Sequence, residues 1–71
     1  MAPIQGRVKF FDAVKGFGFI RNPSGGADYF VHVSQVDPDD VPLVPEQAVV
    51  FVPGKSQKGM AAFNVRRAIY D

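Results

Sequence analysis

The segment Lys15-Gly16-Phe17-Gly18-Phe19-Ile20 places a glycine between two phenylalanines. In an extended strand, side chains alternate between the two faces, so Phe17 and Phe19 stand together on one face. Gly18 and Ile20 fall on the other face, where the glycine offers almost nothing to bury. This pattern is unusual for a core strand, and it leaves two large rings side by side on the surface.

A second segment, Tyr29-Phe30-Val31-His32-Val33, repeats the arrangement further along the chain. Phe30 and His32 share one face, and the other three residues share the opposite one. Two neighbouring strands thus each present a pair of flat rings. Because every base has a π-face and every nucleotide carries a phosphate, such rings flanked by Lys and Arg favour the binding of single-stranded nucleic acid.

The composition predicts a small all-β domain that is stabilised by packing alone. The chain has 71 residues and no cysteine, which excludes disulfides and thiolate-bound zinc. Eleven Val and three Ile stand against a single Leu, and β-branched residues suit pleated strands better than helices. We expect one domain over residues 1–71, folded as a five-stranded antiparallel barrel, since closure removes exposed sheet edges.

The order of apolar runs and turn residues predicts where the five strands lie. We expect strands at about 5–12, 17–21, 28–32, 48–52 and 61–69, after a loose end at 1–4. Two close hairpins followed by a long connection match a Greek-key barrel of the OB type. The core then takes one apolar side chain or more from nearly every strand: Val8, Phe11, Ile20, Val31, Val49, Phe51 and Val65.

Several local features refine this prediction. A bulge near Lys9-Phe10 is needed to bury Val8 and Phe11 together. A short helical turn is expected at 34–36 with Ser34 as its cap, and Pro53-Gly54 is expected to end the fourth strand. The proline-rich and acidic connection 37–46 is expected to be mobile and solvated.

The net charge of +1 hides an uneven distribution along the chain. Residues 1–21 carry four bases and one acid (+3), residues 22–46 carry five acids (−5), and residues 47–71 carry four bases and one acid (+3). The first Phe-rich strand lies in a basic segment, which favours an anionic partner. No apolar run is long enough to span a membrane and no signal pattern is present, so a cytoplasmic location without membrane contact is expected.

The chain resembles the bacterial cold-shock proteins, the cold-shock domain family, over about residues 5–65. The two ring-bearing segments look like the paired ribonucleoprotein-type motifs of that family. The likeness extends to Gly6-Arg7-Val8-Lys9-Phe10-Phe11, Gln47-Ala48-Val49-Val50-Phe51, Lys58-Gly59, Ala62 and Asn64-Val65. It implies an OB-like barrel that binds single-stranded RNA and DNA without a cofactor or metal, and some members act as RNA chaperones or modulate transcription.

The resemblance also implies which residues contact nucleic acid. It places a base-stacking or phosphate-binding role on the following positions: Lys9, Phe10, Lys15, Phe17, Phe19, Phe30, His32 and Lys58. Three positions depart from the family pattern, with Phe10 in place of Trp, Asp12 in place of Asn and Val33 in place of Phe. Less ring area and an added negative charge predict weaker or more selective binding than in a typical member.

Each of these residues also has a simpler interpretation. Phe17, Phe19 and Phe30 could be core residues, although the apolar residues named above suffice for so small a barrel. His32 alone would be read as an ordinary surface histidine, and Lys15, Lys55, Lys58 and Arg66 as solvated charge. Phe63 stands where the family has a small residue, and it could either extend the ring-bearing face or plug the barrel.

The outward parity of Val50 and Val52 raises the hypothesis of a homodimer or another protein contact, although a monomer is the leading expectation. The long acidic connection could also hinge a domain-swapped dimer. An enzyme is disfavoured, because no serine has a base and an orienting acid beside it and no phosphate-binding loop is present. A barrel that binds proline-rich peptide would use the same rings but would not need the basic surroundings.

Overall fold

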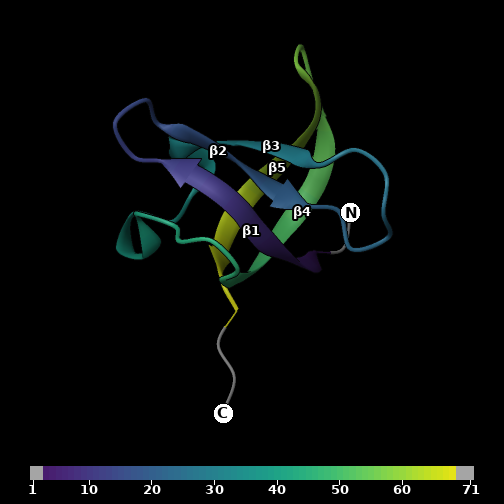
Figure 1. Cartoon of the computed structure of the whole chain (residues 1–71). Coiled ribbons are helices and arrows are strands. Elements are labelled where there is room, and N and C mark those ends of the chain that lie inside the picture. Colours follow the sequence, from purple (N-terminus) through teal and green to yellow (C-terminus); the bar gives the residue numbers. More distant parts are fainter. Residues whose placement is uncertain (1–2, 69–71) are drawn as a thin grey trace.

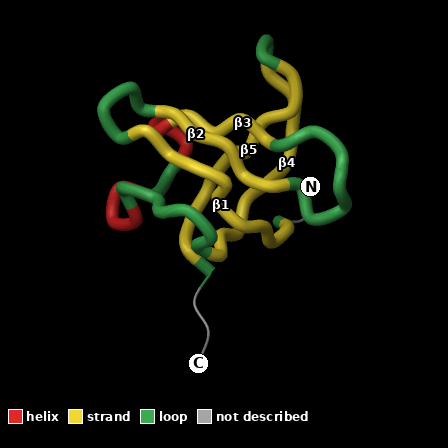
Figure 2. The backbone as a smooth tube through the Cα atoms, in the orientation of Figure 1, coloured by secondary structure: helices red, strands yellow, loops and turns green. Residues whose placement is uncertain are grey.

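The computed structural model describes residues 3–68, which form a closed five-stranded barrel. The strands are β1 (Ile4–Asp12), β2 (Phe17–Arg21), β3 (Tyr29–His32), β4 (Ala48–Ser56) and β5 (Gly59–Arg67) (Figure 1). Two short 3₁₀ turns, η1 (Val33–Gln35) and η2 (Pro38–Asp40), lie between β3 and β4 (Figure 2). The predicted all-β barrel is confirmed. Within residues 3–68, no helix is long and apolar enough to cross a membrane.

The strands follow the order β1-β2-β3-β5-β4 around the barrel. The pairs β1–β2, β2–β3, β1–β4 and β4–β5 are antiparallel. The barrel closes through a parallel contact between β3 and β5, with Phe30 opposite Ala61. This parallel contact departs from the expected antiparallel pattern. With the other four contacts antiparallel, β3 and β5 both run in the direction of β1, so a closed ring of five strands must contain one parallel pair.

The predicted bulge is present in β1. Val8 pairs with Ile20 and Phe10 pairs with Phe19, so the register shifts by one residue between them. The shift buries Val8 completely while Phe10 faces outward, 40% exposed. Gly18 makes this bulge sterically feasible, because a Cβ at Gly18 would lie 2.3 Å from the Phe10 carbonyl oxygen.

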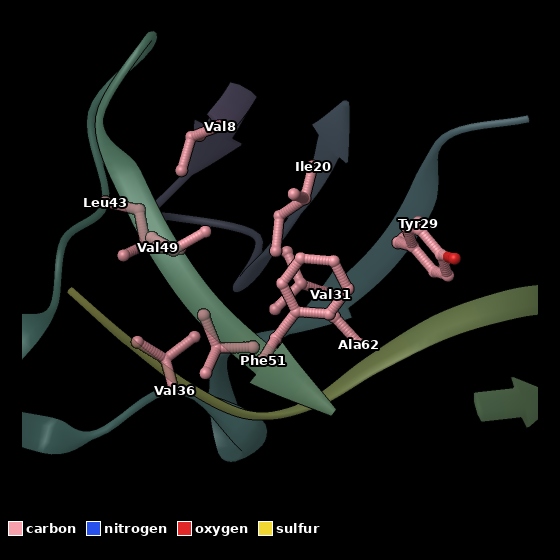
Figure 3. Close-up of a cluster of buried hydrophobic side chains, with 10 residues drawn as sticks. Val8, Ile20, Tyr29, Val31, Val36, Leu43, Val49, Phe51 and Ala62 are labelled. Carbon is pink, nitrogen blue, oxygen red and sulfur yellow. The ribbon is translucent and has the colours of Figure 1, made fainter. Parts of the chain in front are cut away.

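The core lies inside the barrel and matches the prediction closely (Figure 3). Six of the seven predicted core residues are fully buried, namely Val8, Ile20, Val31, Val49, Phe51 and Val65. Phe11 is half-buried and packs against them. Five further apolar residues are buried beyond the predicted core, namely Tyr29, Val36, Leu43, Ala61 and Ala62.

The connection between η1 and β4 is more anchored than its composition suggested. Leu43 is only 3% exposed and packs in the core. The Asp37 N–H donates to the Val65 carbonyl at 2.8 Å, and the Glu46 N–H donates to the Val8 carbonyl at 2.7 Å. Most of the segment is exposed, as expected of a solvated connection, but Leu43 and these two backbone hydrogen bonds tie it to the barrel.

Two strand ends also differ from the prediction. β4 continues through Pro53-Gly54 to Ser56, because β1 pairs with β4 only as far as Phe51 and a proline is tolerated where a strand edge is open. Ile4 belongs to β1, where it pairs with Phe51, rather than to a loose end. The predicted end of the last strand at Ile69 lies outside the described residues, as do Met1 and Ala2.

Candidate nucleic-acid interface

Four phenylalanine rings touch one another on the outward face of β1, β2 and β3. Phe10, Phe19 and Phe30 form a row across the three strands, because Phe19 pairs with Phe10 on one side and with Phe30 on the other. Phe17 lies two residues before Phe19 on the same face of β2. We call Phe10, Phe17, Phe19 and Phe30 the aromatic platform, and none of them belongs to the core cluster.

The rings of the aromatic platform hold one another in place. Centroid distances are 5.6 Å for Phe10–Phe19 and 5.8 Å for Phe19–Phe30. Phe17 and Phe30 are 6.0 Å apart and nearly parallel, at 22°, whereas Phe17 meets Phe19 edge-on at 87°. Such contacts are the favoured geometries of aromatic pairs. A ligand therefore meets rings whose rotamers are already restricted, which lowers the entropic cost of binding.

His32 extends the ring-bearing surface next to Phe17, its partner across β2 and β3. Its Nδ1 accepts the Ser34 N–H at 3.1 Å and lies 2.8 Å from the Ser34 hydroxyl oxygen. His32 is thus the N-cap of η1, and the expectation that Ser34 is the cap was wrong. An imidazole nitrogen can accept this hydrogen bond as well as a hydroxyl can, and the contact orients an exposed ring.

Lys58 comes to the aromatic platform from the hairpin between β4 and β5. Its ammonium lies 5.5 Å from the centroid of the Phe30 ring, within the range of a cation–π contact. Lys15 is exposed in the turn between β1 and β2, and it forms no ion pair among residues 3–68. Both lysines therefore offer their charge to an incoming anion.

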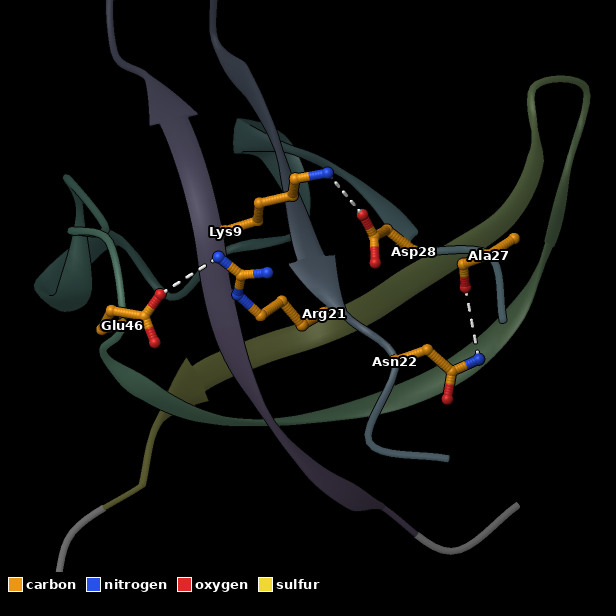
Figure 4. A network of polar contacts seen from close by, with 6 residues as sticks. All are labelled: Lys9, Arg21, Asn22, Ala27, Asp28 and Glu46. Carbon is orange, nitrogen blue, oxygen red and sulfur yellow. Dashed lines mark hydrogen bonds and ion pairs between the residues drawn. The ribbon is translucent and has the colours of Figure 1, made fainter. Parts of the chain in front are cut away.

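Lys9 is engaged by Asp28, a residue that the sequence analysis did not single out. The Lys9 ammonium lies 3.1 Å from the Asp28 carboxylate. Figure 4 shows this contact, which spans β2, since Lys9 lies on β1 and Asp28 directly precedes β3. The pair places a hydrogen-bond donor and an acceptor together at the edge of the rings. No local sequence pattern marks Asp28, because only the pairing of β1 with β2 and of β2 with β3 brings it to Lys9.

Asp12 supports the turn that follows β1. One carboxylate oxygen accepts the backbone N–H groups of Val14 and Lys15, each at 3.0 Å. Asp12 also pairs with Phe17 across β1 and β2, so its charge lies beside the aromatic platform. The Asp12 carboxylate, whose charge is expected to weaken binding, therefore has a structural role as well.

Phe63 and Arg66 lie on β5 outside the aromatic platform. The Phe63 ring packs over Gly54, where an added Cβ would come within 2.7 Å of it. Phe63 is half-buried outside the core cluster, so it does not plug the barrel. Arg66 lines a surface groove together with Gln35, Asp37 and Asn64, and no ring of the aromatic platform lines that groove.

Known proteins match this chain over most of its length. The model of the 'Cold-shock' DNA-binding domain matches residues 4–68. The chain is 46% identical to cold shock-like protein CspC of Shigella flexneri over 92% of this chain and 96% of the relative. It is 48% identical to cold shock protein CapA of Pseudomonas fragi over 82% and 92% of the two chains.

A solved structure shares the fold. The Drosophila Unr CSD456 structure superimposes with a TM-score of 0.76 at 21% identity, covering 94% of this chain and 27% of that one. The closed barrel, the outward rings and the matches in sequence all indicate the same family. The chain belongs to the cold-shock DNA-binding domain family.

Proposed function

We propose that this domain binds single-stranded RNA and DNA by stacking bases on the aromatic platform and His32. Lys9, Lys15 and Lys58 contact the phosphates or base edges of the bound strand. The observation that carries the proposal is the set of four mutually packed rings on the outside of the barrel. Each stacked base contributes on the order of 1 to 3 kcal/mol, judged by alanine substitution at such sites.

The geometry favours unpaired over paired bases. A base in a duplex is already stacked on its neighbours, and it can reach a flat ring only after it is unpaired. A protein that binds only the open form shifts a hairpin toward that form by mass action, without nucleotide hydrolysis. We therefore infer a role in the cytoplasm as an RNA chaperone or a modulator of transcription or translation.

The departures from the family pattern support weaker binding than in a typical member. Phe10 offers less ring area than the Trp that is usual there, and Asp12 adds a negative charge beside Phe17. Val33 is half-buried in η1 and brings no ring to the surface. The connection after β3 contributes no aromatic ring either, and its Leu43 is buried in the core.

Fluorescence anisotropy with labelled oligonucleotides tests the proposal. We expect tighter binding of single strands than of duplexes, affinity that falls with salt, and loss of binding in Phe17→Ala and Phe30→Ala. Phe63→Ala is a matched variant, because it removes a half-buried ring that lies outside the aromatic platform. An affinity that does not change with salt concentration, or the absence of binding at low salt, would contradict the proposal and favour a protein partner.

We propose that the binding unit is a monomer. Val50 and Val52, the residues that suggested a homodimer, are half-buried on β4, where they pair with Arg66 and Phe63 of β5. Sedimentation at high protein concentration tests this. A concentration-dependent dimer that Val52→Ser abolishes would instead place an interface on β4, and one that persists would favour domain swapping.

A further inference from the structure

Two arginines stand opposite one another beyond the aromatic platform. Arg7 of β1 and Arg21 of β2 are direct partners in the β1–β2 register. Arg21 has the same outward parity as Phe17 and Phe19, and it lies about 7 Å beyond Phe19 at the usual rise of a strand. Like charges directly opposite each other destabilise a sheet. An anion between or beside the two arginines reduces their repulsion.

Glu46 supplies the anion within the protein. The Arg7 guanidinium donates to the Glu46 carbonyl oxygen at 2.9 Å. The Arg21 guanidinium lies 3.3 Å from the Glu46 carboxylate, and the two side chains are 53% and 65% exposed (Figure 4). An ion pair so exposed is weak and exchanges readily with other anions.

The backbone of Glu46 is held in an uncommon conformation. Its φ is +69°, in the left-handed region that non-glycine residues rarely adopt. The hydrogen bond from its N–H to Val8 and the one from Arg7 to its carbonyl fix the residue from both sides. Backbone strain of this kind persists where the surroundings impose it, and it is concentrated at ligand sites.

The residues around this pair form a groove on the surface. It is lined by Gln5, Gly6, Arg7, Arg21, Asn22, Pro23 and Glu46. Two guanidinium groups and one carboxylate leave a net positive charge there. Because β1 and β2 also carry Phe10, Phe17 and Phe19, the groove continues the ring-bearing face along the same two strands.

We propose that Arg7 and Arg21 form a binding site for a backbone phosphate of the nucleic-acid strand that leaves the aromatic platform. This inference rests on the proposed function. Guanidinium groups match phosphate oxygens with paired hydrogen bonds, as they do carboxylates. The Glu46 carboxylate occupies the position of the ligand in the free protein, and a phosphodiester displaces it from Arg21.

The test uses three oligonucleotides, a short form and two tailed forms, which differ only in phosphates without bases. The short form has about 4 nucleotides, the lower limit for an OB-type fold, and the tailed forms carry the same bases with an abasic sugar-phosphate tail at one end or at the other. For the wild-type protein, we expect one tailed form to bind on the order of tenfold more tightly, as for hydrogen bonds to charged groups. Arg7→Gln and Arg21→Gln should abolish this gain and leave binding of the short form nearly unchanged.

Arg67→Gln is the matched control. Arg67 also forms a single ion pair at 3.3 Å, with Asp40, and is 54% exposed against 53% for Arg21, but it lies on β5. The Arg21 and Arg67 variants therefore lose the same charge from equally exposed positions. Glu46→Gln removes the competing anion and should tighten binding of the tailed form alone.

The outcomes separate the two claims. If the site exists, the slope of log affinity against log salt concentration for the tailed form is shallower in Arg7→Gln and Arg21→Gln than in the wild type. The difference is about 0.7 for each phosphate contact that is lost. A gain that survives in Arg7→Gln and Arg21→Gln, or that falls equally in Arg67→Gln, would overturn the site and leave the proposed function standing. Failure of the wild type to bind even the short form would overturn the proposed function, and this inference with it.

Discussion

Phe51 and Phe30 are the same side chain on opposite faces of the barrel wall. Phe51 is fully buried, and its ring lies 5.0 Å from that of Tyr29 within the core. Phe30 is half-buried, and it contacts Phe17, Phe19 and the Lys58 ammonium instead of the core. The inner ring stabilises the barrel through burial, whereas the outer rings support one another and leave surface for a ligand.

One strand serves both faces. In β3, Tyr29 and Val31 are buried while Phe30 is half-buried and His32 is exposed, so successive side chains alternate between core and surface. The stability of the barrel and the binding surface are thus encoded in interleaved positions. Substitutions of core residues should therefore mainly lower stability, and substitutions of surface rings should mainly weaken binding.

The largest expected effect comes from removing a ring from the inner face and comparing it with removal of a ring from the outer face. Phe51→Ala should lower the free energy of unfolding by about 3 to 5 kcal/mol, because it removes a fully buried ring and leaves a cavity. Phe30→Ala should cost about 1 kcal/mol, the scale of the ring contacts that it loses. Urea denaturation of both variants measures the difference, and equal losses would refute the division between the two faces.

Gly18 connects the two faces, and its substitution should disturb both. A Cβ in Gly18→Ala would lie 2.3 Å from the Phe10 carbonyl and 2.8 Å from the Phe11 Cα, so the β1 bulge must move. We expect a loss of about 1 to 3 kcal/mol in unfolding free energy, as in overpacked cores. Affinity for single strands should fall in the same variant, since the bulge directs Phe10 outward. Unchanged affinity in the folded variant would show that Phe10 is not needed.

Enlarging an outer ring should sharpen the comparison. Phe10→Trp should tighten binding of single strands by up to about tenfold, within the range of a stacked base. Its stability should change little, because Phe10 is 40% exposed. Phe63→Trp makes the same change at a ring outside the aromatic platform, and anisotropy titrations should show no gain there. A gain in both variants would mean that the site extends over β5.

The smallest expected effect concerns the charge of Asp12. Asp12→Asn keeps an oxygen that can accept the Val14 and Lys15 N–H groups, so unfolding should change by no more than about 0.5 kcal/mol. Removing the charge beside Phe17 should tighten binding a few-fold at low salt, and the gain should vanish at high salt as screening grows. Asp12→Ala, which loses the acceptor too, should be less stable than Asp12→Asn. A gain that persists at high salt would argue against an electrostatic cause.

Much of the barrel could be predicted because alternation in a strand is a local property. The parity of Phe17, Phe19, Phe30 and His32 predicted the outward rings, and that of Val31 and Ile20 predicted buried side chains. Connections were predicted less well. Leu43 and the extension of β4 past Pro53 depend on what packs beside them, and nothing in a proline-rich segment signals such neighbours.

Local patterns in the sequence predict the all-β class, the two ring-bearing strands and the bulge at Lys9-Phe10, since each follows from side-chain alternation and turn chemistry over a few residues. Which residues distant in the chain come into contact depends on the folded barrel. Lys58 reaches Phe30, Asp28 engages Lys9 across β2, and Glu46 joins Arg21 from 25 positions away in the chain. These contacts depend on strand order and closure, which bring together residues that no local pattern connects.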